Sequence, residues 1–312
     1  ALVLAAALEE GVVDENSTFD CPGYYMVNGV RINCSKVQGH GHQTLAEAVQ
    51  NSCNPAFMMI GQRLGAEKFY DYFEAFGMTE VTGIDLPGEE KGQDWGREYF
   101  TSLEGYLSLA TASFGQRFTV TPLQMITAFS AVINGGNLHQ PYVVQSISSK
   151  DGTVVDNTEP TVVRQVVSQQ TSQRVVKILE SVVSEGTGSN AYVAGYHIGG
   201  KSGTSEKLDQ DPREDGTYEK VSSFLAVLPV DDPQIAIGIS IEYGGYGART
   251  GDLVVDIANA YFAMKDGTLE VDPYVNPALS ADPSDDTTGA ADTTDTAGAA
   301  QDETQPEQGS AD

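Results

Sequence analysis

Two β-rich runs with a very short connection between them restrict the fold more than any other feature of the chain. They are VSSFLAVLPV (221–230) and QIAIGISIEY (234–243), joined by the turn sequence DDP. So short a connection allows only antiparallel neighbours, because parallel strands need a crossover of about a dozen residues or more. The segment DLVVDIANAYFAMK after Gly251 returns to helical spacing. We therefore expect an antiparallel sheet flanked by helices and not the parallel sheet of a nucleotide-binding fold.

The sequence before these strands carries several helix signals. Thr44 and Glu47 form a capping box ahead of a short helix, and Thr121 and Gln124 repeat this signature ahead of a later one. Asn54 is expected to cap, and Pro55 to start, a second helix that ends at Gly65. Apolar residues at helical spacing predict further helices over 69–77, 121–133 and 172–185. The predicted class is α+β, with the first two thirds of the chain mainly helical.

Charge divides the chain into two parts. The 312 residues include 44 acidic and 17 basic ones, and the net charge of -27 argues against nucleic acid as a partner. The last segment, 281–312, is rich in Asp and Glu, has no Lys or Arg, and contains alanine as its only apolar residue. Such a segment cannot bury enough apolar surface to fold. We predict a folded domain over 1–268 and an acidic, disordered tail over 269–312.

The stretch GYHIGGKSGTSEK (195–207) fits two unrelated motifs. Gly195, Gly200, Lys201 and Ser202 match the phosphate loop G-x-x-x-x-G-K-[ST], which must lead directly into a helix. The next residues are polar and interrupted by proline and glycine, so no helix is expected there. The same residues match the Lys-[Ser/Thr]-Gly element of enzymes that form an acyl-serine intermediate. The missing helix favours this second interpretation.

A second element of the acyl-serine enzymes precedes this lysine. Ser52, Cys53 and Asn54 fit the Ser-x-Asn pattern, in the order that such enzymes require. Each short motif also has a purely structural explanation. Ser52 and Asn54 could serve as helix caps, and 201–203 could be a turn or the end of a strand.

Longer blocks of sequence resemble the transpeptidase domain of class B penicillin-binding proteins. They are GIDLPGE, SFGQRFTVTPLQMITAFSAVINGG, GTGSNAYVAGYHIGGKSGTSEK and SFLAVLPVDDPQIAIGISIEY, within a resemblance that runs from residue 1 to about 265. The resemblance implies the fold of serine β-lactamases and a D,D-transpeptidase that cross-links peptidoglycan stem peptides ending in D-Ala-D-Ala. It also implies β-lactams as inhibitors, other cell-wall synthesis proteins as partners, and no cofactor.

The resemblance assigns roles to six residues. Ser52 would relay a proton together with Lys201, and Asn54 would bind the substrate amide. Lys201 would supply positive charge, while the Ser202 and Thr204 hydroxyls would hold the substrate carboxylate. Gly203 would let the strand approach the ligand, and the Thr204 N–H would form half of an oxyanion hole.

The nucleophilic Ser-x-x-Lys element of the family is not found in this sequence, because no lysine has a serine three residues before it. In the family this element directly precedes a stretch like ALVLAAALEEGVV, so we expect it just before Ala1. The family fold would then be incomplete at the N-terminus, with an open sheet edge, and the 312 residues alone are expected to fold poorly. A membrane anchor further upstream would hold the domain on the extracytoplasmic face.

The three cysteines leave two states open. Cys21 and Cys34 flank a segment that could fold as a hairpin, so they could form a disulfide or remain buried thiols. A metal site that combines Cys21, Cys34 and Cys53 with His40 and His42 is not favoured, because the spacings match no common zinc motif.

Two other functions remain alternatives to transpeptidation. One is a related acyl-serine hydrolase, such as a carboxypeptidase or a β-lactamase. The other is a catalytically inert partner of the wall-synthesis machinery.

Overall fold

The computed structural model describes residues 1–207, 211–213, 216–245 and 247–268. Residues Ala1–Thr268 form one compact unit. The predicted acidic tail lies outside the described residues and stays a prediction.

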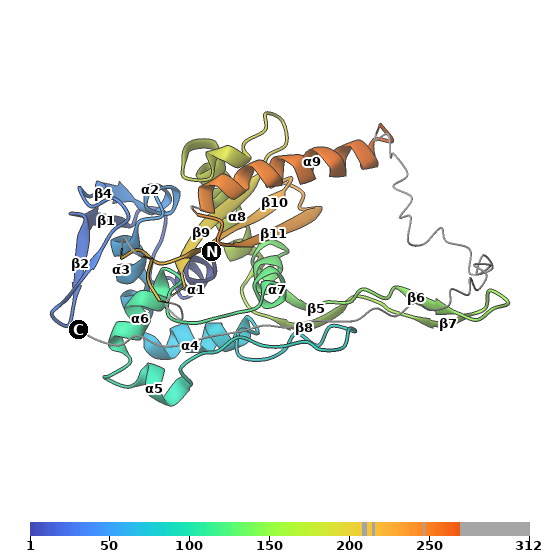
Figure 1. Ribbon diagram of the computed structural model, residues 1–312, viewed down its shortest axis with the longest axis horizontal. Helices are drawn as coiled ribbons and strands as arrows, with labels where there is room; N and C mark the ends of the chain where they lie inside the picture. Colours follow the sequence, from blue (N-terminus) through green and yellow to red (C-terminus); the bar gives the residue numbers. More distant parts are fainter. Residues whose placement is uncertain (208–210, 214–215, 246, 269–312) are drawn as a thin grey trace, which may run out of the picture. The chain divides into compact units, whose positions relative to one another are not determined.

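This unit contains both α-helices and β-strands, as predicted for an α+β fold (Figure 1). The helices are α1 (Leu2–Glu9), α2 (Leu45–Gln50), α3 (Asn54–Leu64), α4 (Ala66–Ala75), α5 (Arg97–Thr101), α6 (Tyr106–Ser113), α7 (Pro122–Ile133), α8 (Gln169–Glu185) and α9 (Gly251–Lys265), with the 3-10 turns η1 (Ser189–Ala191) and η2 (Gly247–Thr250). The strands are β1 (Thr18–Cys21), β2 (Tyr24–Val27), β3 (Val30–Asn33), β4 (Gly41–Thr44), β5 (Asn137–Gln140), β6 (Ser146–Ser148), β7 (Val154–Asn157), β8 (Thr161–Gln165), β9 (Gly199–Glu206), β10 (Lys220–Leu228) and β11 (Ile235–Glu242).

The central sheet is antiparallel, in the order β11-β10-β9, as the two β-rich runs predicted. Side chains alternate between its two faces. On β10, Phe224 packs in a core with residues of α8 and α9, while Val227 packs in the larger helical core. The sheet therefore lies between two apolar layers, which is the arrangement expected of an α+β fold.

The edge of this sheet at β11 has no second partner strand among the described residues. Ile241 and Tyr243 near the end of β11 are 36% and 56% exposed. A strand edge without a partner, flanked by exposed apolar side chains, is a site where a further strand can pair. The expectation that these residues fold poorly alone stays a prediction.

Two capping boxes were predicted correctly and one cap was not. The side chains of Thr44 and Thr121 accept from the N–H groups of Glu47 and Gln124, and both helices start there. Asn54 is the first residue of α3 and does not cap it, because Cys53 occupies the N-cap position without a side-chain hydrogen bond. The Asn54 amide is instead free to reach a carbonyl on another element.

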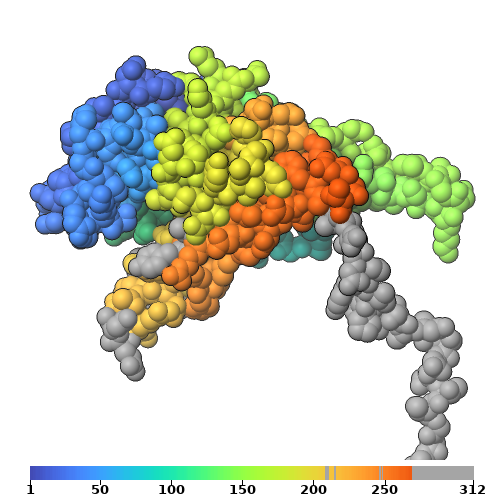
Figure 2. Space-filling view, turned by 90° about the horizontal axis from the view of Figure 1, so that it is seen from above, coloured from blue at the N-terminus to red at the C-terminus, as the bar shows by residue number. Residues whose placement is uncertain are grey.

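The expectation that the first two thirds is mainly helical missed three of the four two-stranded sheets described there, which are β1 with β4, β5 with β8 and β6 with β7; the fourth, β2 with β3, is the hairpin considered between Cys21 and Cys34. Their strands have only three to five residues, too few for a period-2 pattern to stand out. The β6–β7 hairpin is exposed and extends away from the helices in both Figure 1 and Figure 2, where it is light green.

None of the helices among the described residues combines the length and the apolar composition that a membrane crossing requires.

Candidate active site

The turn between α2 and α3 presents Ser52. Its backbone has a φ of 49°, in the left-handed region that non-glycine residues seldom adopt. Two hydrogen bonds hold this turn, since the N–H groups of Ser52 and Cys53 donate to the carbonyls of Val49 and Ala48 at 3.1 and 3.0 Å. A residue held in an unfavourable conformation is often one whose side chain must point in a particular direction.

That direction is toward Lys201. The Lys201 Nζ donates to Ser52 Oγ at 2.8 Å and to the Ser202 carbonyl at 2.7 Å. Lys201 lies on β9 opposite Leu225, on the face of the sheet that packs against the larger helical core. The structure thus joins two residues that are 149 positions apart in the sequence.

Burial changes the chemistry of this lysine. Removal from water disfavours the ammonium form and lowers the pKa of Lys201 to about 8. Lys201 therefore loses its proton at a lower pH than an ordinary lysine does.

The beginning of α1 lies beside β9 (Figure 1). Ala1, which precedes the first residue of α1, lies close enough to Lys201 for the lysine charge to act on its backbone nitrogen. The residue at the start of α1 is thus close to the Ser52–Lys201 pair.

The backbones of β9 and η2 lie in close contact near Lys201. The Gly247 N–H donates to Thr204 Oγ1 at 2.9 Å. A Cβ on Gly247 would lie 1.8 Å from the Gly203 carbonyl oxygen, and one on Gly203 would lie 2.4 Å from Ser223 Oγ. The backbone contact leaves no room for a side chain at Gly247, whereas a Cβ at Gly203 would displace the Ser223 hydroxyl; the predicted role of Gly203 toward a ligand stays a prediction.

The six predicted site residues are only partly brought together. Ser202 and Thr204 lie opposite Phe224 and Ser222, so they occupy the face of the sheet that Lys201 does not face. The Asn54 amide donates to the Asn33 carbonyl at 3.3 Å. Ser52 and Lys201 form the one direct side-chain contact that the structure gives among the six residues.

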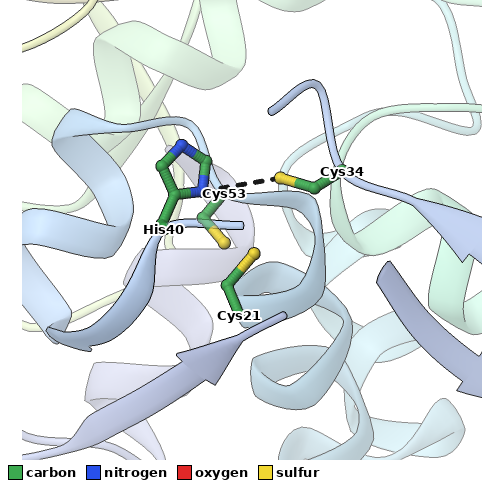
Figure 3. Close-up of side chains that lie close together, drawn as sticks. All are labelled: Cys21, Cys34, His40 and Cys53. Carbon is green, nitrogen blue, oxygen red and sulfur yellow. Dashed lines mark hydrogen bonds between the residues drawn. The ribbon is translucent and has the colours of Figure 1, made fainter. Parts of the chain in front are cut away.

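Sequence reasoning missed the contribution of Gly247, which stands in the glycine-rich segment EYGGYGART after the last strand. It also did not foresee that Cys53, the central residue of Ser-x-Asn, lies close to Cys21, Cys34 and His40 (Figure 3). The signal available in the sequence was the pair of cysteines flanking a hairpin; the predicted hairpin is present as β2 and β3, and all three thiols are free.

Comparison with known proteins agrees with this geometry. Residues 1–263 match the family profile described as penicillin binding protein transpeptidase domain. Stage V sporulation protein D of Bacillus subtilis is 42% identical over 246 residues, which cover 77% of this chain and 37% of the relative. Penicillin-binding protein PbpB of Mycolicibacterium smegmatis is 29% identical, in an alignment that covers 86% of this chain and 43% of the relative. The chain thus spans about two fifths of the length of these curated relatives.

Solved structures show the same fold. The D,D-transpeptidase domain of a peptidoglycan glycosyltransferase from Eggerthella lenta superposes with a TM-score of 0.75 at 28% identity, covering 86% of this chain and 64% of the other. Penicillin-binding protein 3 of Mycobacterium tuberculosis, complexed with aztreonam, superposes with a TM-score of 0.74 at 27% identity, covering 85% of this chain and 61% of the other. With the family profile matched over most of its length, the chain belongs to the penicillin-binding protein transpeptidase domain family, as the class B blocks in its sequence indicated.

Proposed function

We propose that the full-length protein is a peptidoglycan D,D-transpeptidase and that this chain supplies its Ser-x-Asn and Lys-Ser-Gly elements. The 2.8 Å contact between Lys201 Nζ and Ser52 Oγ carries the proposal, because it unites the two elements in one hydrogen-bonded pair. We further propose that the nucleophilic serine belongs to residues preceding Ala1. The position of Ala1 beside Lys201 supports this assignment, since a segment continuing α1 backward enters the site there.

In the proposed reaction the serine Oγ attacks the carbonyl of the penultimate D-alanine. The peptide C–N bond breaks, and the terminal D-alanine leaves with a proton relayed through Ser52. An amine of a second stem peptide then attacks the acyl-serine ester and releases the serine. Lys201 contributes a positive charge beside the developing negative charge, an interaction strengthened by burial. The Ser202 and Thr204 hydroxyls would reach the substrate carboxylate at the free edge of β9.

The proposed location follows from the substrate. Peptidoglycan lies outside the cytoplasmic membrane, so the domain would act on the extracytoplasmic face, held by an anchor in the part of the protein before Ala1. β-Lactams are the inhibitors expected from the proposed site, and penicillin-binding protein 3 of Mycobacterium tuberculosis is known in complex with ampicillin.

The test uses the purified full-length protein, a fluorescent penicillin and a synthetic stem peptide with an amine acceptor. We expect covalent labelling by the penicillin and transfer of the donor peptide to the acceptor with release of D-alanine. Release of D-alanine without transfer would identify a carboxypeptidase instead. A protein that takes up no penicillin would support the inert-partner alternative.

The pKa of Lys201 predicts how acylation depends on pH. Below about pH 8 the ammonium is charged and attracts the carboxylate of a β-lactam; above it the charge is lost. We expect the second-order rate constant of acylation by a carboxylate-bearing penicillin to fall as the pH rises through about 8.

The matched variant is Lys201→Arg, because a guanidinium keeps its charge throughout this range. Its rate is expected to be lower than that of the wild type, with no decline near pH 8. A wild-type rate that rises through pH 8 would mean instead that the neutral amine is the active form.

A further inference from the structure

The end of α2 is held by a residue that belongs to neither of the two predicted motifs. The last carbonyls of a helix have no partner within the helix and must find donors elsewhere. In α2 the carbonyls of residues 47–49 accept from the N–H groups of residues 51–53, which follow directly in the chain. The Gln50 carbonyl instead accepts from Thr187, a residue 137 positions away that lies just after α8.

Thr187 gives this carbonyl two hydrogen bonds. Its N–H donates to the Gln50 oxygen at 2.9 Å, and its hydroxyl donates to the same oxygen at 3.0 Å. A carbonyl oxygen has two lone pairs, so a single residue uses both of them. The acceptor lies two residues before Ser52, whose φ of 49° is in the left-handed region. These bonds therefore hold the backbone that leads into the Ser52 turn.

Gly186 brings the two backbones into contact. A Cβ on Gly186 would lie 2.7 Å from the Gln50 carbonyl oxygen and 2.8 Å from the Gln50 Cα. Both atoms belong to the backbone, which cannot rotate out of the way as a side chain can. A side chain at Gly186 would therefore push the end of α8 away from α2 and break the bonds that Thr187 makes.

The same segment contacts the sheet that carries Lys201. Helix α8 packs against β9, and a Cβ on Gly199 at the start of this strand would lie 3.3 Å from the backbone nitrogen of Glu180. A Cβ on Gly188 would lie 3.3 Å from the ring of Phe224 on β10, the strand that pairs with β9. The chain just after α8 therefore contacts both elements of the candidate active site.

The end of α8 does not need the Thr187 hydroxyl. The N–H groups of Gly186 and Gly188 both donate to the Val182 carbonyl, at 3.1 and 3.0 Å, and close the helix. The Thr187 side chain is exposed, and its hydroxyl donates to α2 and not to α8. Loss of this hydroxyl is therefore expected to leave the fold in place and to affect the turn after α2.

We propose that Thr187 is a positioning residue, which sets the place of Ser52 relative to Lys201. It acts by holding the Gln50 carbonyl and needs no contact with the substrate. The 2.8 Å contact between Lys201 Nζ and Ser52 Oγ joins the turn after α2 to β9, so it requires a fixed spacing of these two elements. The inference rests on the proposed function, in which Ser52 relays a proton.

The experiment compares Thr187→Val with Thr187→Ser in the full-length protein. Valine has a similar shape and keeps the N–H but lacks the hydroxyl, which serine retains. We expect Thr187→Val to lower the rate constant of acylation by penicillin about 10-fold, because a misplacement of about 1 Å can cost about 10²-fold. Thr187→Ser should restore most of the rate. The dissociation constant of penicillin before acylation should stay unchanged, because the residues proposed to hold its carboxylate lie on β9.

The matched control is Thr161→Val. Thr161 lies on β8 and is exposed like Thr187, and its hydroxyl also donates to a backbone carbonyl, that of Glu159 at 3.3 Å. This variant is expected to react with penicillin at the wild-type rate. Equal slowing of the two valine variants would contradict the assignment of Thr187.

A double variant shows whether Thr187 acts through Ser52. Once Ser52→Ala has removed the hydroxyl, its position no longer affects proton transfer. Adding Thr187→Val to Ser52→Ala should therefore slow acylation by less than about 2-fold further. A further loss as large as that of Thr187→Val alone would mean that Thr187 acts by another route, and the inference would be wrong.

Hydrogen exchange tests the contact without any activity. The N–H groups of Ser52 and Cys53 donate to carbonyls of α2, and a less well held turn exposes them to water. We expect faster exchange in a peptide spanning residues 45–54 for Thr187→Val than for the wild type or Thr161→Val. Unchanged exchange would overturn the inference, as would wild-type acylation in Thr187→Val. A wild-type protein that takes up no penicillin would remove the proposed function instead, and faster exchange would still identify Thr187 as the residue that fixes the turn.

Discussion

Lys201→Ala in the full-length protein is expected to lower the rate of acylation by penicillin by about 10²–10⁴-fold, the usual contribution of a positioned proton-transfer group. The substitution removes the positive charge of Lys201 beside Ser52 and leaves Ser52 Oγ without its 2.8 Å donor. Both losses act on the transition state, where negative charge develops and a proton must move. Stopped-flow or gel-based measurement of covalent penicillin labelling gives the rate directly.

The matched control is Lys150→Ala. Lys150 is an exposed lysine between β6 and β7, so its loss removes the same charge from the protein without entering the site. Labelling at the wild-type rate in Lys201→Ala would remove Lys201 from the mechanism and with it the proposed function.

Combining Ser52→Ala with Lys201→Ala tests whether the two residues act together. Groups that serve one proton-transfer path lose most of their effect with the first substitution. The double variant is therefore expected to be little slower than Lys201→Ala alone. If the double variant instead loses the product of the two single-variant losses in rate, the hydrogen bond between Ser52 and Lys201 has only a structural role.

Much of the fold could be predicted because its signals are local. The hairpin of β10 and β11 follows from two β-rich runs and a short turn, and the starts of α2 and α7 follow from capping boxes. The hydrogen bonds that decide these features join residues three apart or strands adjacent in sequence. The expectation that no helix begins at Lys201 was also correct, because residues 199–206 form the strand β9.

The parts that could not be predicted depend on distant pairing. β9 carries the Lys201 side chain on one face and the Ser202 side chain on the other, so these side chains do not form one cluster, and the register with β10 shows what lies opposite each of them. The cap at α3 was misassigned because Asn54 finds its partner in Asn33, 21 residues away. The convergence of Cys21, Cys34, His40 and Cys53 likewise depends on two strand pairs whose strands have only four residues each.

Phe224→Ala is expected to cause the largest loss of stability. The Phe224 ring is fully buried in the core between the sheet and the helices α8 and α9. Removing a buried phenylalanine side chain costs about 3–5 kcal/mol, which corresponds to a fall in Tm of roughly 6–20 °C for a domain of this size. Thermal unfolding of the full-length protein, followed with and without bound penicillin, measures the fall and identifies the transition of this domain.

Two of the residues that line the Phe224 ring are glycines, which have no side chain to move into the resulting cavity. A Cβ on Gly200 would lie 2.5 Å from the Phe224 ring, and one on Gly188 would lie 3.3 Å from it, so the surrounding backbone is already shaped to the ring. Phe224→Leu leaves a smaller cavity and should cost less, whereas Tyr192→Ala, at a side chain 58% exposed, should stay within about 0.5 kcal/mol. Similar losses for Phe224→Ala and Tyr192→Ala would contradict the packing argument. Because Ser202 lies directly opposite Phe224 on the paired strand, the same cavity is expected to loosen β9 and slow penicillin labelling in the variant even below its Tm.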